Sequence, residues 1–600
     1  MARNRFIDDE KTEETFDGKL ILRLFSYLKP YKKQVAVTLF LTLISTGIGL
    51  LIPFLLKVTI DTFIERENMA GLIWMGLCLV VIHIASLYCM RYRIQIMSVT
   101  AKRILMDLRQ ELFDHIQTLS LPFFDNRPVG KILARVIGDV NSLHDLFNNS
   151  VTNLLPDFMT LVCVIIIMLS MNLRLALVSL LILPFLLVGM FLVEIVSRKR
   201  WQLVRKKSSN LNAYIHESFS GIRVIQAYVQ ERETGNIFID LVHNLRSTWL
   251  SAIRVSNAFW PMVDLSWGLG SVLVYWFGIK LLNTTEITVG TLIAFSSYIG
   301  MFWQPIANLS NFYNTVITSM TAAERIFEVM DTKPEIQDKP DAVPLPPIKG
   351  EVVFDGVCFG YEENQQVLGN VSFKVKPGEM IALVGPTGAG KTTIVNLISR
   401  FYEPQKGRVL IDGYDIRDVT LHSLRSQMGI MLQDTFLFSD SIMENIRYGR
   451  LDATDEEVIE AAKAVHAHDF IMSLENGYET QVNERGSRLS VGQRQLISFA
   501  RALLADPKIL ILDEATSSID THTEQLVQNA LKTLLQGRTS FVIAHRLSTI
   551  RNADRIMVID HKGIVEEGNH RQLMERKGMY YELCKAQYRY VHGEDEVLVQ

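Results

Sequence analysis

The chain has 600 residues, which is too long for one hydrophobic core and therefore predicts at least two domains. Lys and Arg number 61 against 64 Asp and Glu, and this balance argues against a protein that binds nucleic acid through a basic surface. Mean hydropathy is positive, which disfavours a wholly soluble chain of this size, and the apolar excess is concentrated in residues 35–310.

The N-terminal residues 1–18 form a polar, acidic tail, whose composition is wrong for a cleavable signal peptide. The next stretch, KLILRLFSYLKPYKK at 19–33, has the apolar and basic pattern of an amphipathic helix. Such a helix buries its apolar face at the boundary of a bilayer. We therefore expect residues 19–33 to lie along the inner membrane surface.

Six apolar stretches follow, and each is long enough to cross a bilayer as a helix, which takes about 20 mostly apolar residues. They are residues 35–56, 71–90, 154–171, 175–196, 259–279 and 288–309. The sequence therefore predicts an all-helical, six-span membrane domain over residues 19–330.

The distribution of basic residues predicts the orientation of these spans, because cytoplasmic loops carry an excess of Lys and Arg. Clusters of basic residues precede span one and follow spans two and four, whereas the opposite loops hold few. Both chain termini, and the domain that follows span six, are therefore expected in the cytoplasm. The basic residues in these clusters are Lys29, Lys32, Lys33, Arg91, Arg93, Arg198, Lys199, Arg200, Arg205, Lys206 and Lys207.

The two cytoplasmic connections, roughly 91–150 and 199–255, are long and have helical patterning. A helical leg of about 25 residues projects about 40 Å past the bilayer. Turn signals at 121–130, LPFFDNRPVG, and at 216–221, HESFSG, mark the tips of these legs. Because long helices do not extend into water without a partner, we expect both tips to contact another domain.

Three carboxylates lie within or near the ends of the predicted spans: Asp157, Glu194 and Asp264. A carboxylate inside a membrane is a functional candidate by default. For Asp264, which is deep in span five, two interpretations are open: a role with substrate or protons, or a role in lining a cavity or pairing helices. Asp157 and Glu194 are expected at the membrane interfaces.

A Pro- and charge-rich stretch at 331–349 predicts a linker, and a second domain is predicted over residues 350–590, with a tail at 591–600. Within that domain, MIALVGPTGAGKTTIVNLISRF at 380–401 has the pattern of a strand, a Gly-rich turn and a helix. Gly385 to Thr392 match the phosphate-binding pattern G-x-x-x-x-G-K-[ST]. Backbone amides and the helix N-terminus can bind phosphates here, with Lys391 reaching the β- and γ-phosphates and the Thr392 hydroxyl reaching Mg²⁺.

The stretch PKILILDEATSSID at 507–520 predicts the partner strand of this site. Asp513 ends an apolar run and can hold the Mg²⁺ shell. Glu514 follows it and can polarise an attacking water.

With these motifs in place, residues 350–590 resemble the nucleotide-binding domain of ATP-binding cassette (ABC) proteins, and residues 15–320 resemble the six-span domain of type IV ABC exporters. The stretch LSVGQ at 489–493 resembles the family signature, which is usually LSGGQ. The resemblance implies a multidomain fold, in which an all-α transmembrane exporter domain is followed by an α/β P-loop domain.

The resemblance also implies roles for single residues, with ATP and Mg²⁺ as cofactors. Glu514, His545 and Gln433 are the implied catalytic residues, and Thr392, Gln433 and Asp513 the implied Mg²⁺ ligands. Asn483, in TQVNERG, replaces the usual Gly of the stretch that meets the membrane-domain loops. The residues implied to contact ATP are Tyr361, Gly385, Pro386, Thr387, Gly388, Ala389, Gly390, Lys391, Thr392, Thr393, Ser490, Gly492, Gln493 and Asp520.

In that family the signature closes over ATP bound to the P-loop of the opposite subunit, so it is half of a site. One cassette and six spans make a half-transporter, which implies a dimer. Val491 departs from the consensus glycine, and an altered signature beside an intact Glu514 and His545 is typical of the hydrolysing member of a heterodimer. Because Ser490 and Gly492 are retained, the sequence leaves homodimer and heterodimer open.

The expected function is ATP-driven export of an amphipathic small molecule, drug or lipid, across a bacterial plasma membrane, with lipid around the spans. An importer or channel on the same fold, and a cassette ATPase that transports nothing, are the alternatives. A voltage- or ligand-gated channel is disfavoured, because the sequence has no Arg-rich sensor span and such a channel would leave the ATP site unexplained. The aromatic residues of the last two spans fit bulky amphipathic substrates, but they equally fit a structural role at the membrane interface.

Overall fold

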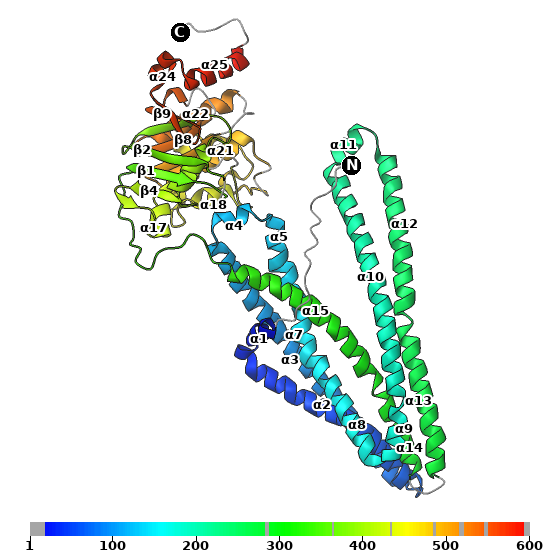
Figure 1. Cartoon of the computed structure of the whole chain (residues 1–600). Coiled ribbons are helices and arrows are strands. Elements are labelled where there is room, and N and C mark those ends of the chain that lie inside the picture. Colours follow the sequence, from blue (N-terminus) through cyan, green and yellow to red (C-terminus); the bar gives the residue numbers. More distant parts are fainter. Residues whose placement is uncertain are drawn as a thin grey trace. The chain divides into compact units, whose positions relative to one another are not determined.

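The computed structural model describes residues 18–282, 287–362, 365–431, 435–483, 486, 488–514, 521–544 and 550–592 (Figure 1). The chain divides into two compact units, which are described separately. The first unit comprises residues 1–117 and 129–332, and the second comprises residues 118–128 and 333–600. The structure confirms the predicted fold class of an all-helical domain followed by an α/β domain.

The first unit is helical throughout its described residues. Its longest helix, α3, has 50 residues and is therefore about 75 Å long, well beyond the ~30 Å apolar core of a bilayer. The helices are α1 (Gly18–Ser26), η1 (Lys29–Tyr31), α2 (Lys32–Val58), η2 (Thr59–Ile64), α3 (Met69–Thr118), α5 (Val129–Ala134), η3 (Arg135–Asp139), α6 (Val140–Ser142), α7 (His144–Asn149), η4 (Ser150–Leu154), α8 (Leu155–Met171), α9 (Leu173–Leu180), α10 (Ile182–Ser220), α11 (Ile222–Ala227), α12 (Glu231–Ser256), α13 (Phe259–Leu282), α14 (Val289–Gly300) and α15 (Trp303–Asp331).

Among the described residues, four helical segments are long and apolar enough to cross a membrane: Lys29–Ile64, Met69–Thr118, Val129–Met171 and Glu231–Leu282. They contain the first, second, third and fifth predicted spans. The other two predicted spans lie on α9–α10 and on α14–α15, each of which is interrupted by a turn. Apolar side chains on these helices point outward, as lipid contact requires, with Trp74 73% and Phe40 62% exposed.

The predicted amphipathic stretch at 19–33 forms α1, η1 and the first two residues of α2, and α1 packs on α15. Arg23 forms an ion pair with Asp331 at 2.7 Å, and its guanidinium lies 4.1 Å from the ring centre of Phe327. The ring of Tyr27 stacks on the same phenylalanine. Leu22 is 73% exposed, which leaves an apolar face free for a membrane surface.

Helices α10 and α12 form a long hairpin joined by α11, and Figure 1 shows this hairpin diverging from the side of the unit that contains α3 and α15. Its tip lies beyond the predicted spans and is apolar on the outside. Phe219, Val224, Tyr228 and Val229 are between 61% and 79% exposed. An apolar tip in water is typical of a surface that another protein covers.

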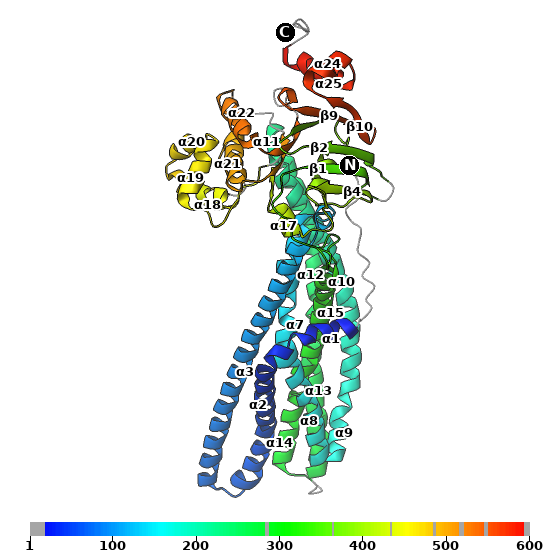
Figure 2. The same ribbon diagram turned by 90° about the vertical axis from the view of Figure 1, so that its left-hand side faces the viewer.

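The second unit contains two sheets and their surrounding helices (Figure 2). A six-stranded sheet has the order β10-β9-β3-β8-β7-β6, and a four-stranded antiparallel sheet has the order β2-β1-β4-β5. The strands are β1 (Val352–Phe359), β2 (Leu368–Val375), β3 (Met380–Val384), β4 (Lys406–Ile411), β5 (Tyr414–Asp415), β6 (Met428–Met431), β7 (Ile509–Glu514), β8 (Thr539–Ala544), β9 (Arg555–Asp560) and β10 (Gly563–Gly568).

The helices of the second unit pack on both sides of the larger sheet and make a separate group at α18–α20 (Figure 2). One hydrophobic cluster contains this group and α21, and another lies between the two sheets and α16. The helices are α4 (Leu121–Asp125), α16 (Lys391–Ile398), α17 (Leu421–Arg425), α18 (Ile442–Arg447), α19 (Asp455–Ala464), α20 (His468–Met472), η5 (Gly477–Glu479), α21 (Val491–Leu504), α22 (Thr521–Leu535), α24 (His570–Arg576) and α25 (Met579–His592).

Residues 118–128, the tip of the first predicted cytoplasmic leg, belong to the second unit although they are more than 200 residues from its other members in sequence. This tip segment contains α4. Leu121 packs against the cluster between the two sheets, and Phe123 is buried. The Ser120 hydroxyl accepts a hydrogen bond from the backbone N–H of Glu335 at 3.1 Å.

Candidate functional site

The Gly-rich turn at 385–390 joins β3 to α16, and glycine is required at both of its ends. Gly385 has φ +151°, and a Cβ there would overlap the carbonyl oxygen of Ile559. Gly390 has φ +105° and caps α16 without any side-chain hydrogen bond to the first turn. The N-terminal amides of α16 therefore have no side-chain cap, and an anion can bind to them.

Lys391 begins α16 and is only 7% exposed. Its Nζ donates hydrogen bonds to the carbonyl oxygens of Gly385 at 2.8 Å and Pro386 at 2.9 Å. Burial lowers the pKa of Lys391, and the negative charge of Asp513 opposes that shift. The ammonium group is thus held inside the loop that the phosphates would occupy.

Two threonines follow the lysine and face different surroundings. Thr392 is exposed, which leaves its hydroxyl available to a metal ion, whereas Thr393 is buried. The hydroxyl groups of Tyr361 and Thr393 are 3.1 Å apart. The ring of Tyr361 packs edge-on against Phe359 and Tyr402 but remains 49% exposed, so a flat face is available for stacking.

The acidic strand β7 lies two strands from the P-loop strand, with β8 between them. The parallel register aligns Leu383 with Ile543 and Ile543 with Asp513. At the usual strand spacing this puts the Asp513 backbone roughly 10 Å from the strand that leads into the turn. All these strands end at one edge of the sheet, and the carboxyl edge of a parallel sheet is where ligands bind.

Glu514 ends strand β7, and His545 and Gln433 follow strands β8 and β6 in sequence, but the side chains of all three lie outside the described part of the chain. Glu514 is the last residue of β7 and pairs with Ala544. His545 directly follows Ala544, and Gln433 lies two residues after Met431, the end of β6. Asp520 also lies outside the described residues, as do most of its neighbours.

The loop and side chains fit a magnesium nucleotide. A glycine cradle that a Cβ would fill, an uncapped helix N-terminus and a buried ammonium group fit phosphates. An exposed hydroxyl and a nearby carboxylate, Thr392 and Asp513, are ligands of the kind that Mg²⁺ prefers.

The signature stretch is the N-terminus of α21, and a capping box fixes it. The Ser490 hydroxyl accepts from the backbone N–H of Gln493 at 3.2 Å, and the Gln493 side chain accepts from the N–H of Ser490 at 2.9 Å. Val491 is the first helical residue and is 42% exposed, whereas Gly492 is buried. Arg494 holds the preceding loop by donating to the carbonyl oxygens of Gly486 and Leu489.

The signature and the P-loop are not parts of one site within the described residues of this chain. Helix α16 packs in the cluster between the sheets, whereas α21 packs on α18, α19 and α22 in the other cluster. No hydrogen bond among the described residues joins 385–393 to 490–493. The two stretches therefore belong to different clusters of the second unit.

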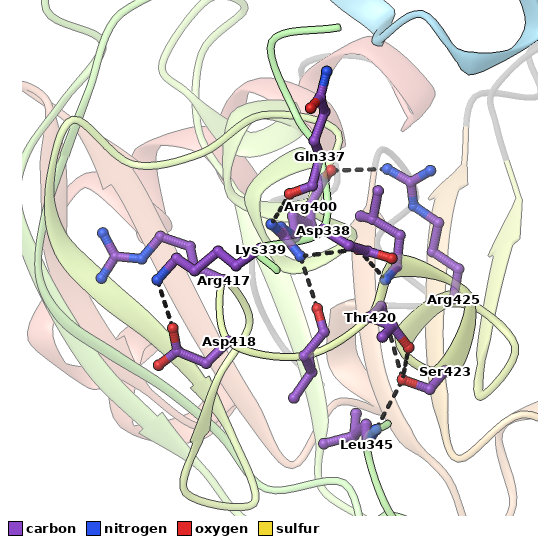
Figure 3. Close-up of polar contacts among 12 residues, drawn as sticks. Gln337, Asp338, Lys339, Leu345, Arg400, Arg417, Asp418, Thr420, Ser423 and Arg425 are labelled. Carbon is purple, nitrogen blue, oxygen red and sulfur yellow. Dashed lines mark hydrogen bonds and ion pairs between the residues drawn. The ribbon is translucent and has the colours of Figure 1, made fainter. Parts of the chain in front are cut away.

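Sequence reasoning missed a buried arginine just beyond the P-loop helix. Arg400 is 1% exposed and has φ +51°. Its guanidinium donates to the carbonyl oxygens of Gln337 at 3.0 Å (Figure 3) and Val419 at 2.9 Å. It also donates to the Glu403 carboxylate at 2.8 Å. Gln337 belongs to the predicted linker, so Arg400 fixes the linker to the end of α16.

Neighbouring contacts hold the same linker. The Asp338 carboxylate accepts from the N–H of Leu421 at 2.8 Å, and Lys339 forms an ion pair with Asp418 at 2.6 Å (Figure 3). These bonds hold the predicted linker along the second unit. Nothing in the residues next to Arg400 in sequence indicates that this arginine binds the linker.

A second missed residue, Tyr402, connects the nucleotide side of the unit to the tip segment. Its hydroxyl donates a hydrogen bond to the Asp125 carboxylate. Burial and this carboxylate raise the pKa of Tyr402. The turn signals at 121–130 marked the region of the tip segment in the sequence, but they did not indicate which residue the segment contacts.

Comparison with known proteins places this site in context. The family description "ABC transporter transmembrane region" matches residues 35–306, and "ABC transporter" matches residues 368–517. The uncharacterized ABC transporter ATP-binding protein YknV of Bacillus subtilis strain 168 is 47% identical over 599 residues, which is 98% of each chain. The ATP-dependent lipid A-core flippase of Syntrophus aciditrophicus strain SB is 37% identical over 597 residues, covering 100% of this chain and 98% of that one.

Among solved structures, a bacterial Atm1-family ABC exporter with ATP bound superposes with a TM-score of 0.78 at 29% sequence identity. The similarity covers 94% of this chain and 99% of that one.

Proposed function

The chain belongs to the ABC transporter family, as an exporter that joins a transmembrane region to an ATPase domain, and from this premise we propose a dimeric half-transporter. It couples ATP hydrolysis to the export of an amphipathic drug or lipid. The observation that carries the proposal is the separation of the P-loop and the signature helix into different clusters of one unit. A complete site then needs the signature of a second chain.

The signature helix has the form of such a half-site. Its N-terminus is capped locally by Ser490 and Gln493, and both Ser490 and Val491 face outward. A helix N-terminus attracts anions through its amides and its dipole. Ser490 and the Gly492 amide would therefore contact the γ-phosphate of ATP held on the partner's P-loop, which favours closure of the dimer.

The roles that we propose for the chain's own residues in hydrolysis follow from the resemblance of their motifs to those of the family. Lys391 holds the β- and γ-phosphates, and Tyr361 stacks on adenine. Glu514 takes a proton from the attacking water, and His545 contacts the γ-phosphate. Thr392, Asp513 and Gln433 would hold Mg²⁺, which supplies positive charge where negative charge develops on the phosphate oxygens.

The two tips support an arrangement that couples the cassettes to the spans. The tip segment at 118–128 contacts the second unit of its own chain through Asp125 and Tyr402. The tip at 216–229 carries exposed apolar side chains and belongs to the first unit. We propose that the partner's cassette covers this second tip. Each chain would then contact both cassettes of the dimer.

The closed and open arrangements of the two cassettes form a two-state equilibrium. ATP shifts this equilibrium only if it binds the closed state more tightly. Hydrolysis removes the γ-phosphate contacts across the dimer, so the closed state loses its advantage. The helical legs then convert cassette closure into outward opening of the spans. With Lys and Arg concentrated at the cassette side of the spans, both termini and the cassettes lie in the cytoplasm of a bacterial cell.

Two questions inside this proposal depend on the partner and the direction of transport. A homodimer and a heterodimer differ in whether LSVGQ completes the partner's site. An importer on the same fold would take substrate up in oriented vesicles, and a cassette ATPase without transport would not respond to any substrate.

The test is the Mg²⁺-ATPase activity of the chain purified alone in lipid, beside Glu514→Gln and Lys391→Ala. A homodimer predicts robust turnover that Glu514→Gln abolishes with ATP binding intact, whereas Lys391→Ala weakens ATP binding itself. Normal turnover in Glu514→Gln would disprove the general-base role. A folded, ATP-binding chain without turnover would show that the second half-site belongs to a different polypeptide.

A further inference from the structure

The ring of Tyr361, the residue expected to stack on adenine, is fixed by its neighbours although half of it is exposed. The rings of Phe359 and Tyr402 pack edge-on against it, each with its centre 5.0 Å from that of Tyr361. These two side chains are only 4% and 9% exposed, which limits their movement. The Tyr361 hydroxyl also lies 3.1 Å from that of Thr393, which is buried on α16. The exposed face of Tyr361 therefore has a defined position and orientation.

The backbone next to Tyr361 is held by Gln405. The Gln405 side chain donates a hydrogen bond to the carbonyl oxygen of Gly360 at 3.1 Å. The backbone N–H of Gln405 donates to the carbonyl oxygen of Cys358 at 3.0 Å. Residues 402–405 therefore position both the ring of Tyr361 and the backbone that carries it.

Tyr402 has a second partner in the tip segment at 118–128, because its hydroxyl donates to the Asp125 carboxylate. A tyrosine that is almost fully buried needs a partner for its hydroxyl, so this bond helps to fix the orientation of the ring. The same ring is in edge-on contact with Tyr361. Departure of the tip segment would remove the partner of Tyr402 and free its ring to turn away from Tyr361.

The phosphate end of the site has different supports. The Lys391 ammonium donates to the carbonyl oxygens of Gly385 and Pro386. Gly385 lies so close to the carbonyl oxygen of Ile559 on β9 that a Cβ would overlap it. These supports come from the P-loop and from β9. Movement of Tyr402 would therefore disturb the place of the base more than the place of the phosphates.

We propose that Tyr402 is a positioning residue for the nucleotide base and that it couples binding of the base to docking of the tip segment. A ring that is already held in place binds a flat base with less loss of freedom than a ring that must first be ordered. Coupling between two sites is reciprocal, so a bound base favours the docked tip segment as strongly as the docked segment favours the base. Phosphates without a base do not engage this coupling.

The inference rests on the proposed function, in which Tyr361 stacks on adenine. It adds a residue whose role follows from its contacts with both Tyr361 and Asp125. It also predicts a difference between the two ends of the nucleotide, and this difference can be measured without any turnover.

The test measures binding of Mg²⁺–ADP and of Mg²⁺–pyrophosphate to the full chain in lipid nanodiscs. ADP carries the base and pyrophosphate does not, and calorimetric titration of ADP, with pyrophosphate as the competitor, gives both affinities. Tyr402→Leu should weaken ADP binding about three- to tenfold, as the loss of one pre-ordered side chain predicts, and should change pyrophosphate binding by no more than about twofold. Tyr402→Phe keeps the ring but loses the bond to Asp125, so its affinity for ADP should be intermediate.

Three further variants serve as controls. Asp125→Asn weakens the same hydrogen bond from the other side, so it should lower the affinity for ADP in the same direction as Tyr402→Phe. These two mild variants carry the comparison if Tyr402→Leu does not fold. Tyr414→Leu, at an exposed position on β5, should leave both affinities unchanged. Lys391→Ala should weaken both ligands, because its ammonium group is expected to reach the phosphates.

Hydrogen exchange measures the coupling from the side of the tip segment. At equal saturation, ADP should slow exchange of the amides in 118–128 about threefold or more, whereas pyrophosphate should not. In Tyr361→Ala the effect of ADP should disappear, since the phosphates still bind but the stacking ring is absent. A purely structural role of Tyr402 would instead change exchange in 118–128 equally with either ligand and without one.

Equal weakening of ADP and pyrophosphate in the Tyr402 variants would overturn the proposal, and so would unchanged ADP affinity or equal protection of 118–128 by both ligands. ADP binding that depends on Tyr361 but not on Tyr402 would contradict this inference alone. Absence of ADP binding, or ADP binding that responds to neither Tyr361→Ala nor Lys391→Ala, would contradict the proposed nucleotide site as well. Failure of the inference is thus distinguishable from failure of the proposed function.

Discussion

The hydroxyl of Tyr402 donates a hydrogen bond to the carboxylate of Asp125, joining the P-loop side of the second unit to the tip segment at 118–128. Tyr402 lies four residues beyond the end of α16. Its ring packs edge-on against Tyr361, with ring centres 5.0 Å apart, and the Tyr361 hydroxyl is 3.1 Å from that of Thr393. Two contacts thus connect the expected adenine-stacking ring to the tip segment, and a third connects it to α16.

Removing the hydroxyl in Tyr402→Phe should loosen the tip segment without changing the P-loop. A hydrogen bond to a charged group contributes about 1.5–3 kcal/mol, so opening of 118–128 should become at least about tenfold more frequent. Hydrogen exchange of the amides in 118–128, measured by mass spectrometry on the full chain, reports this opening.

Tyr414→Phe is the matched control, because Tyr414 is 44% exposed on β5. Asp125→Asn keeps an acceptor but loses the charge, so its exchange should be intermediate. Unchanged exchange in Tyr402→Phe would show that the apolar contacts of Leu121 and Phe123 alone hold the segment.

Arg400 should be far more important for stability than a surface arginine with a similar ion pair. Arg400→Met leaves the Glu403 carboxylate and the Gln337 and Val419 carbonyl oxygens without their donor. Breaking a buried charged network of this kind costs about 3–5 kcal/mol. The midpoint of thermal unfolding of the cassette should fall by several degrees. Calorimetry, or near-UV signals that do not come from tryptophan, would measure this midpoint.

Arg408→Met provides the comparison. Arg408 pairs with Asp355 at 2.9 Å, but the two side chains are 57% and 54% exposed. Exposed pairs contribute about 0–1 kcal/mol, so this midpoint should barely move. Equal shifts in the two variants would contradict a structural role for the Arg400 network.

The sequence predicted the parts of the molecule that local patterns encode. Apolar runs located the helices, and the Gly385 to Thr392 pattern located the strand, turn and helix where they occur. Arg400 and the Tyr402–Asp125 bond were not predictable, because their partners lie 63 and 277 residues away in sequence. Asp264 was recognised as unusual, but only the structure puts Trp303 beside it in one cavity.

The glycine that begins the P-loop should not tolerate even one methyl group. Gly385→Ala would set a Cβ against the carbonyl oxygen of Ile559 in a left-handed backbone conformation. We expect ATP affinity, measured by titration with a fluorescent analogue, to fall more than about tenfold, because the loop must move away from the phosphates. Gly378→Ala, which also has positive φ but meets open space, should retain its affinity.

The stability of the cassette should decline in mild acid through His570. Burial, with a smaller contribution from Arg551, lowers the pKa of His570, whose ring nitrogen lies 2.6 Å from the Tyr580 hydroxyl. The folded state therefore binds fewer protons than the unfolded state, in which the pKa is about 6.5. His570 therefore contributes to the free energy of unfolding above about pH 6.5, the pKa in the unfolded state. This contribution is lost as the pH falls through the lower pKa of the folded state.

Unfolding midpoints of wild type and His570→Gln, measured from pH 7.5 down to pH 5.5, check this sign. The difference between the two proteins should shrink as the pH falls. A His422→Gln control, at an exposed position on α17, accounts for the loss of a histidine at the surface. A constant difference across this range would assign the effect to packing against Tyr580 instead of protonation.

We expect a signature with valine at position 491 to support ATP hydrolysis. The capping box uses the side chains of Ser490 and Gln493, and the Val491 side chain is half-exposed at the first helical position. Val491→Gly should therefore change the Mg²⁺-ATPase activity of the lipid-embedded chain by no more than about twofold, since the cap retains its geometry. Ser490→Ala breaks the cap, at a cost of about 1 kcal/mol, and also removes the expected phosphate contact, so its activity should fall more than about tenfold. A large gain of activity in Val491→Gly would instead identify Val491 as the feature that limits the site, as a heterodimer with a degenerate half-site requires.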